Sequence, residues 1–221
     1  MFLGHYGIAF AAKRLAPRTS LGTLSFAAQF CDELWPILLL LGVEQVHIEP
    51  GVMAANPLDF ASYPISHSLL AVIVWAVVIG VAYAVMLRKK RGAIVIGLAV
   101  LSHWFLDLPM HRPDLPLMPG VSTKVGFGLW RSLHLTLVLE LLVFAGGIWV
   151  YLRTTRARDR MGTWTLWAMI LVLTATYLGS LFGPAPKTER GVAIGALGLW
   201  IFVPWAAWID WHRTPRGSAP H

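Results

Sequence analysis

The chain is poor in cysteine and in charged residues, and each shortage excludes a class of protein. Cys31 is the only cysteine among 221 residues, which excludes an internal disulfide and a zinc site built on several thiolates. Charged residues make up 13% of the chain and hydrophobic residues 57%, whereas about a quarter of an average soluble domain is charged. The N-terminal sequence MFLGHYG lacks the basic segment and the small-residue cleavage site of a secretory signal peptide. The composition is that of an integral membrane protein.

Long apolar runs predict an all-α, polytopic membrane bundle. A bilayer is crossed by about 20 apolar residues, and six stretches qualify as full spans: 21–42, 64–87, 92–108, 129–152, 162–183 and 192–211. A seventh stretch, 2–16, is shorter, and a tilted span, a half-span and an interfacial helix all suit it, which gives six or seven transmembrane helices. Strands are not expected, because the apolar runs are continuous rather than alternating.

The chain shows no internal repeat and no break between domains. We expect one transmembrane domain over residues 1–212, with its metal-site part in residues 1–140. The polar tail, 213–221, is predicted to be disordered and cytoplasmic.

Positive charge is concentrated at one end of the predicted bundle. Most of the 18 Lys and Arg residues lie in 13–20, 88–91, 153–160 and the C-terminal tail. The positive-inside rule makes this end cytoplasmic and the loops 43–63 and 109–128 extracytoplasmic, in a plasma or inner membrane. The run RKKR is compatible with a nucleic-acid or lipid head-group patch, but a topology signal is the more common meaning. The placement of the charges behind the net charge of +7 therefore predicts how the bundle is oriented in the membrane, and no nucleic-acid partner is expected.

Several ionisable residues interrupt these apolar stretches, mainly in the predicted outer half of the bilayer. Such residues are costly in hydrocarbon and are functional candidates. The candidates for metal ligands are His5, Asp32, His67, His103 and Asp107. His103 and Asp107 are four residues apart, so they share one helix face. Imidazole and carboxylate donors without thiolates favour a catalytic Zn, Mn or Fe site.

Each of these candidates also has a purely structural interpretation. For His103 and Asp107 it is a hydrogen bond at a helix end, and for His67 it is a position at the membrane interface. For Asp32 it is a carboxylate that packs the bundle through hydrogen bonds to water or to the backbone.

The segment HRPD (111–114) follows the helix that carries His103. Pro109 is predicted to end that helix near Leu108. His111 and Asp114 would then be free to fold back over the helix end. His111 becomes a sixth candidate metal ligand, and the segment is expected to lie on the substrate side of the site.

Four further residues are candidates for catalysis. Asp114 or Glu33 would act as the general base on a metal-activated water. Arg112 and Lys124 share the outer loop and would bind a phosphate or stabilise developing negative charge. Snorkelling or simple solvation explains these two cations equally well.

Four short motifs carry a family resemblance: GHYG (4–7), QFCDELW (29–35), SHS (66–68) and HWFLD (103–107). Together they resemble the YdjM-like membrane-bound metal-dependent hydrolases. Their order is also similar to that in the zinc-dependent phospholipase C and single-strand nuclease superfamily, all-α enzymes that cleave phosphate esters with a zinc cluster. The resemblance covers roughly residues 1–140 and implies the metal ligands His5, Asp32, His67, His103 and Asp107.

The chain departs from the soluble phospholipases at two places. Those enzymes carry a later His-x-x-x-Glu helix, whereas here the nearest pair, His134 and Glu140, is six residues apart and does not share a helix face. They also use the N-terminal amine as a ligand, whereas Met1 precedes His5 by four residues. We therefore expect one or two metal ions, with Zn as the leading candidate, rather than a three-metal cluster.

These observations predict a metal-dependent hydrolase that acts on a lipid or other small phosphoester substrate at the outer membrane face. One alternative is an intramembrane zinc amidase of the alkaline-ceramidase type, in which Ser68 or Ser102 would take part. A second alternative is a metal or ion transporter or a metal-binding membrane protein. Against transport stand the lack of an inverted repeat and the concentration of ligand candidates in one leaflet. The sequence does not predict an oligomeric state.

Overall fold

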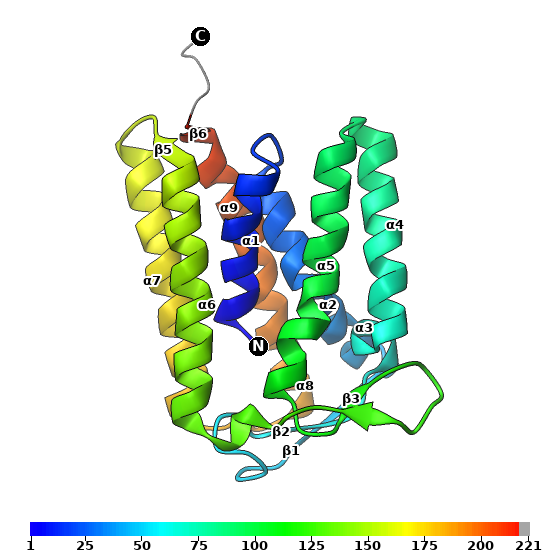
Figure 1. The fold of residues 1–221 in the computed structure, drawn as a ribbon. Coiled ribbons are helices and arrows are strands. Elements are labelled where there is room, and N and C mark those ends of the chain that lie inside the picture. The colour runs from blue at the N-terminus through cyan, green and yellow to red at the C-terminus, as the bar shows by residue number, and fades with distance from the viewer. Residues whose placement is uncertain (217–221) are drawn as a thin grey trace.

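The computed structural model describes residues 1–216, whose long helices form one bundle (Figure 1). The α-helices are α1 (Leu3–Leu15), α2 (Leu21–Leu40), α3 (Pro64–His67), α4 (Leu69–Leu87), α5 (Lys90–Met110), α6 (Leu133–Thr154), α7 (Arg160–Phe182), α8 (Glu189–Leu197) and α9 (Phe202–Trp211). Two 3-10 turns, η1 (Leu129–Arg131) and η2 (Gly198–Ile201), precede α6 and α9. The prediction of a helical membrane bundle is confirmed at this level.

The prediction of six full spans is wrong. Within residues 1–216, five helical segments are long and apolar enough to cross a membrane: 69–87, 90–110, 133–154, 160–182 and 189–211. The predicted span that is not among them, 21–42, corresponds to α2, which has the length but carries Gln29, Asp32 and Glu33 in its middle. Because α2 packs against α1, α5, α8 and α9, protein rather than lipid surrounds these polar side chains.

Helix α1 is a half-length helix inside the bundle. Its 13 residues extend about 20 Å, less than the roughly 30 Å of a hydrocarbon core. Its N-terminus lies midway along the bundle and its other end lies near the turn between α4 and α5 (Figure 1). Gly7 lets α1 approach α6 closely, because a Cβ there would lie 2.6 Å from the carbonyl oxygen of Val143. Of the three forms considered for residues 2–16, a half-span describes α1.

Apolar side chains fill the bundle on both sides of α1. One buried cluster joins α2, α4 and α5, and a second joins α1, α6, α7 and α9. The outward faces remain apolar as well, as Val77 and Val85 of α4 show with 59% and 72% exposure. A helix that is apolar all round is typical of a membrane span.

Short strands in the connecting loops correct the expectation of a chain without strands. Three antiparallel pairs form: β1 (Gln45–Ile48) with β2 (Leu58–Ser62), β3 (Leu115–Pro116) with β4 (Lys124–Val125), and β5 (Thr155–Ala157) with β6 (Arg213–Pro215). They lie at the ends of the bundle, so the apolar runs gave no indication of them (Figure 1). Strand β6 also occupies the start of the tail predicted to be disordered; residues 217–221 lie outside the described part of the chain.

The predicted span 64–87 is divided at Ser68. The backbone of Ser68 is extended, with ψ 145°, and its Oγ accepts a hydrogen bond from the N–H of Ala71 at 3.3 Å. Ser68 is therefore the N-cap of α4, and the preceding turn, α3, is a separate element. This break places His67 at the end of α3.

Helix α5 continues through Pro109 to Met110, which corrects the predicted end near Leu108. A proline in the last turn removes a single backbone hydrogen bond, and the helical contacts before it suffice to keep Leu108 helical. His111 is the first extended residue after the helix, with ψ 144°.

Candidate metal centre

Five ionisable side chains from four helices meet inside the bundle. They are His5 of α1, Asp32 of α2, His67 of α3, and His103 and Asp107 of α5, and they form two overlapping groups. Within each group, His5–His103–Asp107 and Asp32–His67–His103, the possible ligand atoms all lie within 4.8 Å of one another. The structure thus brings together the residues that the sequence motifs selected.

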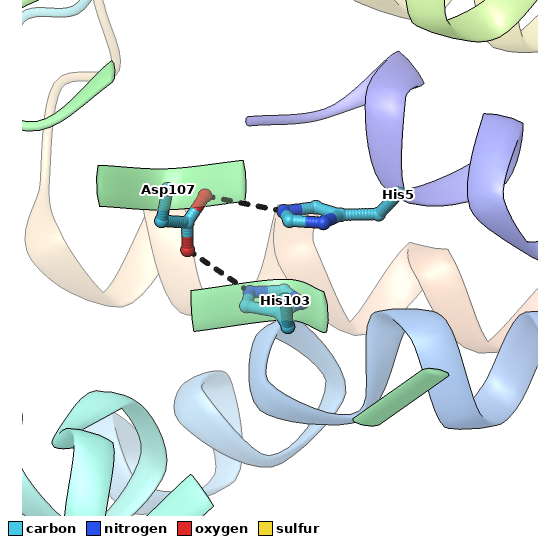
Figure 2. Close-up of side chains that lie close together, drawn as sticks. All are labelled: His5, His103 and Asp107. Atoms are coloured by element: carbon cyan, nitrogen blue, oxygen red, sulfur yellow. Dashed lines mark hydrogen bonds and ion pairs between the residues drawn. The ribbon is translucent and has the colours of Figure 1, made fainter. Parts of the chain in front are cut away.

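The Asp107 carboxylate faces the edges of two stacked imidazoles, those of His5 and His103 (Figure 2). Its Oδ1 is 3.2 Å from His5 Nε2, and its Oδ2 is 3.2 Å from His103 Nε2. The two imidazole rings are nearly parallel, with centroids 3.7 Å apart. The amino group of Met1 also contacts Oδ1. Each carboxylate oxygen therefore faces a different histidine.

Asp32 and His67 complete the cluster on the other side of His103. Asp32 Oδ1 lies 3.4 Å from His67 Nε2 and 3.7 Å from His103 Nε2. His67 Nε2 is also 3.9 Å from Asp107 Oδ2. The Asp32 side chain is 24% exposed, whereas the other four are at most 5% exposed. Asp32 is therefore the most accessible member of the cluster.

Hydrogen bonds behind the cluster fix the orientation of two imidazoles. His103 Nδ1 lies 2.9 Å from the carbonyl oxygen of Ala28, an acceptor only, so Nδ1 carries the proton. Ser66 Oγ donates to Glu44 Oε2 at 2.6 Å and so accepts from His67 Nδ1 at 2.7 Å. Both Nε2 atoms then present a lone pair to the carboxylates. Metal-binding histidines are held in the same way, through the ring nitrogen that does not bind the ion.

Sequence reasoning missed Glu44. This carboxylate is 2% exposed and accepts hydrogen bonds from the backbone N–H groups of Ile65 and Ser66 as well as from the Ser66 hydroxyl. It therefore holds the short helix that carries His67. The sequence did contain a signal, because Glu44 directly follows the uncharged run PILLLLGV. An acidic residue at the end of such a run is a candidate for a structural role.

The His134 and Glu140 pair has no role as a pair of ligands in this geometry. Glu140 is buried and accepts hydrogen bonds from the backbone N–H groups of Phe2 and Gly4, at 2.7 and 2.8 Å. A carboxylate at this position satisfies N–H groups at the start of α1. His134 is exposed and belongs to neither group.

A cavity of about 360 Å³ opens onto the cluster. Asp32, His67 and Asp107 lie on its wall, and His111 lies there too. The rest of the wall is largely apolar and includes Trp35, Phe60, Trp130, Tyr177, Leu181 and Leu199. A ligand in this cavity would therefore contact both the ionisable cluster and an apolar surface.

His111 lies on the cavity wall but in neither ligand group. Its Nδ1 is 2.9 Å from Asp114 Oδ1 and 3.2 Å from the Tyr63 hydroxyl. Burial lowers the pKa of His111 below its usual value, and the hydrogen bond with Asp114 opposes that shift. The structure therefore places this predicted ligand beside the cluster, as a neutral imidazole backed by a carboxylate.

The four residues predicted to be catalytic do not line the cavity. Asp114 is bonded to His111 and accepts from Arg112 Nε at 3.2 Å, while the other end of that guanidinium contacts Asp59. Lys124 Nζ donates to a backbone carbonyl in β2 at 3.3 Å. Glu33 is buried, and its Oε2 has no hydrogen-bond partner within residues 1–216.

A divalent cation suits the donors of this cluster. Three imidazoles and two carboxylates converge, and within residues 1–216 the buried His103 Nε2 has no hydrogen-bond partner. Nitrogen and oxygen donors without sulfur are compatible with Zn, Mn or Fe. No protein-family model, curated protein or solved structure matches the chain.

Proposed function

We propose that this protein is a membrane-embedded, metal-dependent hydrolase, with Zn²⁺ as the leading candidate ion. The observation that carries the proposal is the convergence of three imidazoles and two carboxylates on the wall of a largely apolar cavity. Buried carboxylates and imidazoles without a cation are costly in a bundle, and they mark functional sites. The distribution of Lys and Arg supports an extracytoplasmic position for the cavity.

The donor atoms set the number of ions that the cluster can hold. His103 can offer only Nε2, because Ala28 occupies its Nδ1. One ion would use His103 with Asp32, His67 and Asp107 Oδ2. His5 and Asp107 Oδ1 would hold a second ion. This division supports one or two ions, the number expected from the chain's departures from the soluble phospholipases.

His111 is the residue best placed to take a proton from the attacking water. When bound, a divalent ion would lower the pKa of a coordinated water to about 7 and polarise the scissile group. His111 lies on the same cavity wall as three of the proposed ligands, and Asp114 holds its ring through Nδ1. Asp114 then positions the base rather than acting directly, and Arg112 in turn holds Asp114.

The cavity wall favours a substrate with an apolar part. Aromatic and aliphatic residues from α2, α7 and η2 surround most of the space, and neither Arg112 nor Lys124 reaches it. A lipid whose hydrolysable phosphoester reaches Asp32 suits this surface. The serines needed for an amidase are engaged locally: Ser68 caps α4, and Ser102 donates to the carbonyl of Ala99 at 2.7 Å.

Hydrolysis of a lipid extract tests this function. The purified protein is loaded with Zn²⁺ and incubated with total membrane lipids, and the products are identified by mass spectrometry. We expect a phosphoester product that is lost in His103→Ala and Asp107→Ala and retained in the exposed control His134→Ala. His111→Gln should lower the rate by about 10²–10⁴-fold with metal content unchanged. Absence of any hydrolysed lipid, or full activity of both ligand variants, would contradict the proposal.

A further inference from the structure

A second polar pocket lies at the opposite end of the bundle from the candidate metal centre. It measures about 520 Å³, and its lining residues come mainly from the turn that joins α1 to α2 and the turn that joins α4 to α5. Both turns lie at the same end of the bundle (Figure 1). Four cationic side chains line it: Arg18 from the first turn, and Lys89, Lys90 and Arg91 from the second. Residues far apart in the sequence thus bring four positive charges to one concave surface.

These cations have no carboxylate partner within residues 1–216. Arg18, Lys89, Lys90 and Arg91 are all exposed, and none takes part in an ion pair in this part of the chain. Within the described residues, the one side-chain hydrogen bond among them is donated by Lys89 Nζ to the backbone oxygen of Arg18, at 3.5 Å. Four like charges around one pocket repel each other, so the surface favours an anion.

The start of α5 adds to the positive potential of the same pocket. This helix of 21 residues begins at Lys90, and no side chain caps it. Its first N–H groups and its dipole therefore point toward the pocket with no side-chain acceptor from the protein.

An apolar groove adjoins this pocket on the outside of the bundle. It measures about 560 Å³ and runs between α4 and α5. Gly80, Ala93 and Gly97 are among its less exposed lining residues, and Val77, Ile94 and Leu98 are among its exposed ones. Lys90 lines both the groove and the basic pocket, so the two surfaces adjoin each other at this residue.

We propose that this end of the bundle binds an anionic phospholipid. The headgroup phosphate occupies the basic pocket, and one acyl chain lies in the groove between α4 and α5. Basic pockets between transmembrane helices bind anionic headgroups in this way. A free phosphate would use the pocket but not the groove, and the contact between the two surfaces at Lys90 favours the lipid. The proposal does not depend on the hydrolase assignment, because the pocket and the metal centre share no residue.

Native mass spectrometry of the detergent-solubilised protein tests both halves of the proposed site. Phosphatidylglycerol and phosphatidylcholine are titrated separately, and we expect one phosphatidylglycerol to bind with a clear preference. Lys89→Gln with Arg91→Gln should weaken that binding about fivefold for each charge removed, which corresponds to about 1 kcal/mol per cation. Arg156→Gln with Arg160→Gln removes the same charge from the same end but outside the pocket, and should leave binding unchanged.

Two adjacent valines test the groove without changing charge. Val77 lines the groove and Val78 does not, and both are exposed on α4. Val77→Trp should fill the groove and weaken phosphatidylglycerol binding, whereas Val78→Trp should not. Both tryptophan variants keep the basic pocket intact. Comparing them therefore tests the proposal even if the charge variants fail to fold.

Four results would overturn the proposal. They are equal affinity for the two lipids, equal loss in the pocket and control variants, equal binding by the two tryptophan variants, and displacement of the lipid by millimolar inorganic phosphate. A second copy of the chain on this face, seen as a dimer that excludes the lipid, would overturn it as well.

Discussion

Ser66 offers a sharp test of the candidate metal centre, because it orients the proposed ligand His67 without being a proposed ligand itself. Ser66→Ala removes the hydroxyl that accepts from His67 Nδ1 at 2.7 Å and donates to Glu44 at 2.6 Å. Glu44 keeps its two backbone donors, so α3 should remain folded. His67 loses the hydrogen bond that sets its tautomer and orientation. We therefore expect a change in metal affinity rather than in fold.

The size of the effect follows from the two hydrogen bonds of the Ser66 hydroxyl. A hydrogen bond to a neutral partner contributes about 0.5–1.5 kcal/mol, and one linked to a charged group contributes about 1.5–3 kcal/mol. The hydroxyl takes part in one of each kind. Together the two bonds correspond to about 2–4.5 kcal/mol, of which only the part that orients His67 affects metal binding. We therefore expect Zn²⁺ to bind about 10–100-fold more weakly, which is about 1.4–2.8 kcal/mol and the range for residues behind metal ligands.

Competition with a chromophoric zinc chelator in detergent measures this change. Ser66→Thr keeps a hydroxyl at the same position and should restore the affinity. Ser68→Ala is the matched control, since Ser68 is equally buried but caps α4 instead of contacting His67. It should cost about 1 kcal/mol of stability and leave metal affinity unchanged. The reasoning fails if Ser66→Ala binds zinc as tightly as the wild type, or if both alanine variants weaken it equally.

Three further predictions concern the scaffold. Lys13→Met breaks the buried contact with Asp210 and should lower stability in detergent by about 3–5 kcal/mol, whereas adding Asp210→Leu should recover part of the loss. Unfolding midpoints give both values, and equal midpoints for the single and double variants would contradict this account. Gly126→Ala would place a Cβ 2.1 Å from a carbonyl oxygen of the HRPD turn, at φ 152°, so thermal unfolding should show a loss of more than about 1 kcal/mol. The carboxylate of Glu189 hydrogen-bonds to His47 and raises the pKa of its imidazole. The ion pair between them should therefore be fully formed below about pH 6.5 and lost as the pH rises through the raised pKa of His47. An NMR titration of His47 measures it, and an unchanged midpoint in Glu189→Gln would argue against the contact.

The candidate ligands were predictable from the sequence because they are ionisable residues in apolar stretches, where solvation cannot explain them. The four-residue spacing of His103 and Asp107 fixed their common face, and the structure places Asp32 and His67 opposite that face. The helix positions followed from the same apolar runs. The apolar runs do not distinguish a helix surrounded by lipid from one surrounded by protein. For this reason the sequence predicts a full span for α2.

The surroundings of the site were less predictable, because they depend on contacts between distant segments. Arg112 and Asp114 looked like residues facing substrate, yet Asp59 in β2 and His111 engage them. The role of Glu44 depends on the turn at Ser66, which only the break in the span 64–87 reveals. Local spacing carries no information about such long-range partners.

The metal content of the purified protein tests the central claim most directly. Inductively coupled plasma mass spectrometry of the wild type should give one or two equivalents of a divalent transition metal per chain. His103→Ala and Asp107→Ala should lose most of it, and the exposed control His134→Ala should retain it. A wild-type protein that stays metal-free after incubation with Zn²⁺, Mn²⁺ and Fe²⁺, or ligand variants that keep a full complement, would contradict the account.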